Sequence, residues 1–190
     1  ADHREYMDVS YTEAIARMKK VIREVDSNAV VGLEGLQMPS AWGGYDLWRL
    51  SRNLDWCEPY DVSCSREILR SFLPADVPVL MTVFGNEYSK LRLQLWSRLL
   101  HGDNGCLVWD DENSRCLDKA NPEISITERG ESLSKIFRDI KKAAPNIIGL
   151  NRKQPSIAIH YSQPSIRAHW MFDSREDGDT WHRRYSSYEA

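Results

Sequence analysis

Five acidic residues are candidates for chemistry because each lies at or just after an apolar segment: Glu34, Glu58, Asp61, Glu87 and Asp110. Two carboxyl groups can act as general acid and nucleophile when burial or a charged neighbour separates their pKa values. Glu34 is flanked by Gly32 and Gly35, so a ligand can approach it closely. We therefore predict catalytic roles for Glu34 and Glu87, and substrate hydrogen bonding for the other three acids.

Each of these acids also has a structural interpretation. Glu34, Glu58 and Asp61 could be salt-bridged acids at the rim of a sheet. Glu87 stands just before an expected helix, where a negative charge favours the helix dipole. Asp110 begins the acidic run Asp110-Asp111-Glu112, and such runs are often solvated loops. The residue types alone leave both interpretations open.

Two tryptophans fit a site for a sugar ring. Trp109 ends an apolar run and Trp42 lies in a glycine-rich loop. An indole face can bury the C–H face of a saccharide through dispersion contacts. We predict substrate contacts for these two residues, whereas Trp48, Trp56 and Trp96 are expected in packing roles.

Composition excludes several classes of protein. The 190 residues include 25 Lys and Arg against 28 Asp and Glu, a formal charge of −3. Nucleic acid is therefore not expected as the main partner, because phosphate binding favours a basic surplus. No apolar run approaches the roughly 20 residues that a membrane-spanning helix needs. The four cysteines match no zinc spacing and are expected to be free thiols, and no glycine-rich nucleotide motif occurs.

The elements that must position these residues alternate along the chain. Apolar runs predict strands over residues 29–33, 54–59, 78–85 and 105–109. Helical spacing predicts helices over residues 10–26, 46–53, 65–72 and 90–101, the first starting at a capping-box pattern, Ser10 to Glu13. Strands that alternate with helices indicate βαβ units and a parallel sheet. Their carboxyl ends share one edge, where a (β/α)8 barrel carries its active site.

The remaining residues have a different pattern. Leu133, Ile136, Phe137 and Ile140 predict one amphipathic helix, and residues 145–154 are typical of a linker. A strand over 156–162 and a helix from 165 to 172 then suggest a new βα unit. We expect a domain boundary near residue 150, which divides the chain into domains 1–150 and 151–190. The ends of the chain suggest a piece of a longer polypeptide.

Several segments together resemble glycoside hydrolase family 42, the β-galactosidase group. The resemblance lies in Trp96-Ser97-Arg98-Leu99-Leu100-His101-Gly102 with the strand 105–109, in Leu54 to Asp61, and in Ile157-Ala158-Ile159-His160-Tyr161-Ser162-Gln163-Pro164-Ser165. It implies the C-terminal half of a (β/α)8 TIM barrel, followed by the first βα unit of a flavodoxin-like trimerisation domain. It also implies a homotrimer and no cofactor or metal.

The same resemblance implies hydrolysis of a glycosidic bond, of the β-galactoside type and with retention. Its general acid would lie upstream of Ala1. Its nucleophile position, at the end of the seventh strand, matches Thr82, and the nearest acid is Glu87. Thr82 cannot replace a carboxylate as the glycosyl acceptor. Two alternatives stay open: a non-catalytic carbohydrate-binding relative, and an α/β enzyme with unrelated chemistry.

Overall fold

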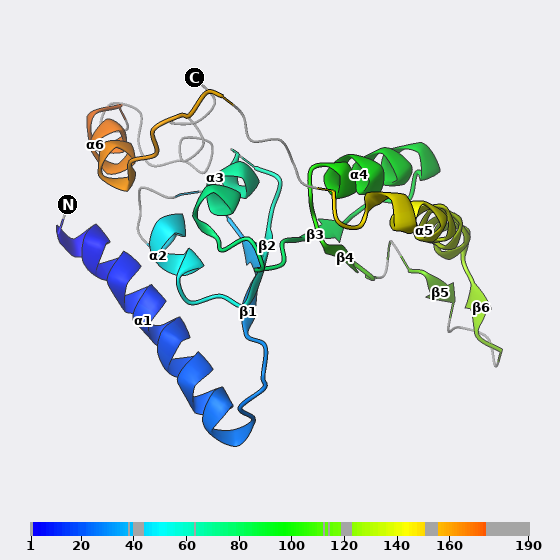
Figure 1. Cartoon of the computed structure of the whole chain (residues 1–190), viewed down its shortest axis with the longest axis horizontal. Helices are drawn as coiled ribbons and strands as arrows, with labels where there is room; N and C mark the ends of the chain where they lie inside the picture. Colours follow the sequence, from blue (N-terminus) through cyan, green and yellow to red (C-terminus); the bar gives the residue numbers. More distant parts are fainter. Residues whose placement is uncertain are drawn as a thin grey trace. The chain divides into compact units, whose positions relative to one another are not determined.

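The computed structural model describes residues 2–37, 39, 44–62, 64–111, 113, 115–118, 123–150 and 156–173 (Figure 1). The chain divides into two compact units, residues 1–79 with 158–190, and residues 80–157. The described residues form six helices, two parallel strand pairs and one antiparallel pair. The protein is therefore a mixed α/β protein. Among these residues no helix combines the length and apolarity that a membrane crossing requires.

Two parallel strands form the centre of the first unit, β1 (Gly32–Leu36) and β2 (Trp56–Pro59). Between them lies α2 (Leu47–Ser51), which begins at Asp46 because this carboxylate accepts hydrogen bonds from two backbone N–H groups of the first turn. After β2 comes α3 (Ser65–Phe72), the helix predicted over these same residues. The buried core consists of Ile15, Leu36, Leu47, Leu50, Leu54, Cys57, Leu69 and Val79.

The first helix, α1 (Asp2–Val25), begins eight residues earlier than the capping-box pattern predicts. Thr12 lies inside it, and its hydroxyl donates to the backbone carbonyl of Asp8 at 2.8 Å. The earlier turns are helical because Asp8, only 1% exposed, has partners within the unit. A tertiary contact thus extends this helix beyond its local start signal.

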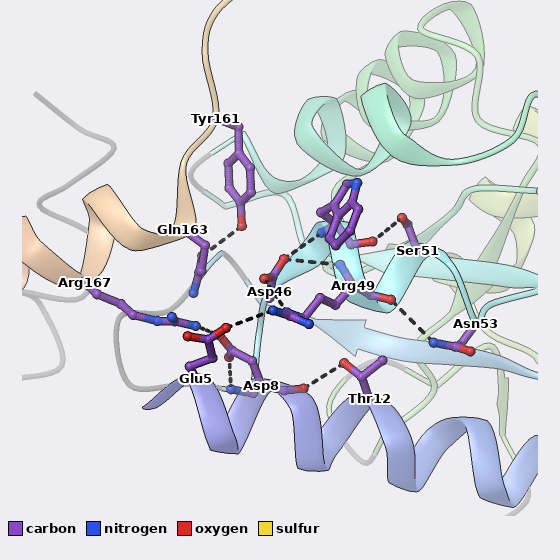
Figure 2. A network of polar contacts seen from close by, with 12 residues as sticks. Glu5, Asp8, Thr12, Asp46, Arg49, Ser51, Asn53, Tyr161, Gln163 and Arg167 are labelled. Carbon is purple, nitrogen blue, oxygen red and sulfur yellow. Dashed lines mark hydrogen bonds and ion pairs between the residues drawn. The ribbon is translucent and has the colours of Figure 1, made fainter. Parts of the chain in front are cut away.

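Helix α6 (Gln163–Asp173) contacts α1 through a buried ion pair, which Figure 2 shows within its polar network. The Arg167 guanidinium pairs with one oxygen of the Asp8 carboxylate, and the other oxygen accepts the backbone N–H of Gly44. At the start of α6, the Tyr161 hydroxyl donates to the Gln163 side chain at 2.8 Å. These contacts connect residues 161–167 to the N-terminal helix.

The second unit has the same alternation. Strands β3 (Leu80–Val83) and β4 (Gly105–Val108) are parallel, and α4 (Tyr88–Leu100) connects them. The hairpin of β5 (Leu117–Asp118) and β6 (Ser125–Ile126) leads into α5 (Glu128–Ile147). The buried core consists of Met81, Val83, Leu91, Leu95, Leu133 and Ile136. Helix α4 ends at Leu100, and His101 follows it as the C-cap residue.

The structure confirms the α/β class and the parallel pairing of β1 with β2 and of β3 with β4, which form two separate two-stranded sheets. The strand predicted over residues 156–162 is wrong, because these residues pair with no strand in the described part of the chain, and Ile157 and Ile159 are 79% and 93% exposed. The predicted linker begins too early, since α5 continues through Pro145. A proline in the last turn removes only one backbone hydrogen bond. The domain boundary near residue 150 stays a prediction, although the compact units group residues 158–190 with the first.

Candidate functional site

The predicted site residues lie in both units. Glu34 and Glu58 lie on β1 and β2 of the first unit, whereas Glu87, Trp109 and Asp110 follow the strands of the second. The expected convergence of Glu34, Glu58 and Glu87 in one cleft stays a prediction. Trp42 lies outside the described residues.

Two aromatic rings stand together at the carboxyl edge of the second unit's parallel strands. Phe84 directly follows β3, and Trp109 directly follows β4, where its backbone N–H donates to Val83 O at 3.2 Å. The ring centroids are 5.8 Å apart and the ring planes are inclined by 42°. Phe84 is 46% exposed and Trp109 is 44% exposed. We call Phe84 and Trp109 the aromatic pair.

The indole of Trp109 has a fixed orientation. Its Nε1–H donates to Asp111 Oδ2 at 2.9 Å. The other oxygen of Asp111 accepts the backbone N–H of Asn113 at 2.9 Å. A side chain held at both its backbone and its ring nitrogen loses little further freedom when a ligand binds.

The loop that carries Phe84 is held by a buried arginine. Arg129, in the first turn of α5, is 4% exposed. Its Nη2 donates to Val83 O at 3.1 Å and its Nε to Gly85 O at 2.8 Å. Because these carbonyls flank Phe84, the guanidinium fixes the backbone on both sides of that ring.

Glu87 occupies the N-cap position of α4 and has its own partners. Its side chain, 57% exposed, pairs with Lys90 Nζ at 2.8 Å and accepts a hydrogen bond from the Ser89 hydroxyl. The Lys90 hydrogen bond, followed by that of Ser89, holds the pKa of Glu87 below its ordinary value. Glu87 is therefore ionised at neutral pH and fits a nucleophile or base better than a proton donor.

Asp110 closes the loop that follows β4. Its Oδ1 accepts the backbone N–H of Cys116 at 2.8 Å, six residues along the chain. This bond gives Asp110 a structural role whether or not it also contacts a substrate. The predicted role in substrate binding stays a prediction.

A bulge brings Glu34 and Glu58 to neighbouring positions in the first unit. Leu33 pairs with Cys57 and Leu36 pairs with Pro59, so Glu34 and Gly35 together lie opposite the single residue Glu58. Gly35 has φ of +69°, a conformation that favours glycine. Bulges are frequent beside active sites because they redirect side chains.

The two carboxylates at this bulge have different environments. Glu58 is 1% exposed, and its Oε2 accepts the backbone N–H of Gly35 at 2.7 Å. Glu34 is exposed. A buried and an exposed carboxyl group thus lie on adjacent strands. Asp61, also exposed, lies two residues beyond the end of β2.

Thr82, at the position that the resemblance gives to the nucleophile, is 6% exposed in the middle of β3. A buried hydroxyl in a strand does not supply the missing carboxylate.

Sequence reasoning missed Phe84 and Arg129. Phe84 had a usable signal, because it follows β3 just as Trp109 follows β4. Arg129 had a weaker one: a cation in the first turn of a helix opposes the helix dipole, and such a residue often has a tertiary partner. Its partners are the backbone carbonyls of Val83 and Gly85, which lie close to Arg129 only in the folded chain.

Comparison of the chain with family models, with curated proteins and with solved structures yields no match.

Proposed function

We propose that this chain is part of a carbohydrate-active protein, a glycoside hydrolase resembling family 42, and that the aromatic pair is its saccharide-binding surface. The proposed architecture is the C-terminal half of a (β/α)8 barrel followed by the start of a flavodoxin-like domain. A homotrimer belongs to the same proposal, which rests on the resemblance of the sequence segments described above.

The observation that carries the proposal is the aromatic pair. Two large rings, each almost half exposed, stand at the carboxyl edge of two parallel strands. In α/β proteins ligands bind at this edge. Rings inclined by 42° offer two faces to successive units of a sugar chain.

Polar groups that suit sugar hydroxyls lie on the same two loops as these rings. The Asp111 carboxylate contacts the Trp109 indole directly and is an acceptor beside that ring. Glu87, held ionised by Lys90, is a further acceptor on the loop that follows β3. Apolar stacking faces next to a few oriented acceptors are typical of small-ligand sites.

Glycoside hydrolysis with retention needs two carboxyl groups about 5–5.5 Å apart. Of the two predicted catalytic residues, we propose Glu87 as the carboxylate that attacks the sugar, because it is ionised, exposed and in the same unit as the aromatic pair. The predicted catalytic role of Glu34, which lies beside Glu58 in the first unit, stays a prediction.

A second candidate function is saccharide binding without hydrolysis. Two observations favour it. Glu87 already pairs with Lys90 and Ser89. Thr82, at the position that the resemblance gives to the nucleophile, is buried. In this case the aromatic pair would bind the sugar and no carboxylate would attack it.

A panel of aryl glycosides and the matching oligosaccharides, tested on the full-length protein, separates these functions. Trp109→Ala should weaken saccharide binding by about tenfold, or about 1.4 kcal/mol, because it removes one stacking face. Trp48→Ala is the matched control, since Trp48 is 43% exposed in the other unit. Equal affinity of both variants and the wild type would exclude the aromatic pair as the sugar site.

Hydrolysis is tested with Glu34→Gln and Glu87→Gln on the same substrates. A large loss of kcat in one variant, with sugar affinity retained, identifies the nucleophile. Binding by a wild-type protein that releases no aglycone from any substrate would support the second function and refute the first.

A further inference from the structure

The second unit contains an open groove that the proposed function does not use. It holds about 620 Å³ between the end of β4, the β5–β6 hairpin and α5. Its walls are mainly apolar and include Val108, Leu117, Ile126, Leu133 and Phe137. Cavities of this size and lining accommodate small ligands with an apolar body.

Two cations lie on the α5 wall of the groove, Arg138 and Lys141. They stand three residues apart on α5, which places them on one side of that helix. Within the described part of the chain, no carboxylate forms an ion pair with either of them. Asp110, the acid on the groove wall, already accepts the backbone N–H of Cys116. The groove therefore combines apolar walls with unpaired positive charge.

We propose that this groove binds a carboxylate attached to an apolar chain or ring. The carboxylate pairs with Arg138 and Lys141, and the apolar part packs against Leu133, Phe137 and the hairpin. The complementary charge excludes an apolar cation as the preferred ligand. This site is separate from the aromatic pair and does not depend on carbohydrate activity.

A cysteine in the groove supplies a direct readout of occupancy. Cys116 lines the groove, and its Sγ accepts a hydrogen bond from Arg129 Nη1 at 3.2 Å. Cys64, exposed in the other unit, serves as the internal reference. Cys57 is buried, and burial raises the pKa of the Cys106 thiol, so both should react slowly.

The experiment measures alkylation of each cysteine by N-ethylmaleimide, with mass spectrometry of the peptides, in the presence of dodecanoate below its micelle concentration. We expect dodecanoate to slow the reaction of Cys116 at least fivefold and to leave Cys64 unchanged. The double variant Arg138→Glu and Lys141→Glu should lose this protection. Lys142→Glu, an exposed cation on the same helix outside the groove, should retain it.

Three results would overturn the proposal. The first is that dodecanoate leaves Cys116 unprotected at every concentration. The second is that dodecyltrimethylammonium protects Cys116 equally, which would show apolar contact without charge recognition. The third is that Cys116 and Cys64 change rate together, which would show general unfolding. The far-UV circular dichroism of each variant, with its Cys64 rate, distinguishes a lost site from a lost fold. Saccharide affinity, measured in the same variants, should not change.

Discussion

Replacement of Arg129 by methionine tests whether a buried guanidinium positions the aromatic pair. Methionine keeps much of the apolar stem and removes the donors. Val83 O would retain the backbone N–H of Trp109, so the main loss is the charged hydrogen bond to Gly85 O. A hydrogen bond that involves a charged group contributes about 1.5–3 kcal/mol, and the Val83 bond adds a smaller part. We expect the free energy of unfolding to fall by about 2–4 kcal/mol.

The assay is urea unfolding combined with hydrogen exchange of the loop between β3 and α4. Exchange should accelerate at residues 84–87, because the two carbonyls that flank Phe84 lose their common donor. Arg138→Met is the matched control on the same helix, because Arg138 forms no ion pair with a carboxylate among the described residues, and its effect should stay within about 0.5 kcal/mol.

One result would refute this reasoning. If Arg129→Met unfolds at the wild-type urea concentration and the 84–87 loop exchanges at the wild-type rate, then Arg129 does not hold the strand ends. Saccharide affinity is measured separately. A destabilised loop with unchanged sugar affinity would leave the structural role of Arg129 intact and would count against the aromatic pair as the sugar site.

Three further perturbations have defined outcomes. Burial opposes ionisation of Asp55, but the hydrogen bond from Lys19 and the neighbouring donors and charges outweigh burial and lower the pKa of Asp55 below 3.8. The wild type should therefore be more stable than Asp55→Asn in urea unfolding above pH 3.8, and this difference should fade as pH falls through the lowered pKa. Asp8→Ala removes the ion-pair partner of the buried Arg167, so the free energy of unfolding in urea should fall by about 3–5 kcal/mol. A fall no larger than that for an exposed ion pair would show that the contact is absent. Ile136→Ala leaves a cavity in the second core and should cost about 2–5 kcal/mol by the same measurement.

The alternation of strands and helices could be predicted because it depends on local patterns. Leu91 and Leu95 recur at helical spacing and are both buried in α4. The run at Leu80–Val83 is apolar apart from Thr82, which favours a strand covered by helices. The ends of the elements were less predictable: the Ser10–Glu13 pattern resembles a helix start, yet Asp8 and Arg167 hold the preceding turns in α1.

The strand expected over residues 156–162 shows the limit of local patterns. Its alternating apolar residues have the period of a strand, but a strand also needs a neighbour whose backbone groups pair with its own. Ile157 and Ile159 remain exposed and unpaired with any described strand. No sequence pattern within the segment specifies whether such a neighbour exists.

The sequence by itself determined the α/β class and the parallel pairing of β1 with β2 and of β3 with β4, because periodicity along the chain is a local property. Only the tertiary structure decided how the acidic and aromatic side chains are used. It joined Phe84 to Trp109, bound Arg129 to the carbonyls that flank Phe84, and gave Asp110 and Glu58 backbone partners. The physical reason is that a buried or paired polar group depends on neighbours far along the chain, which only folding brings within hydrogen-bond distance.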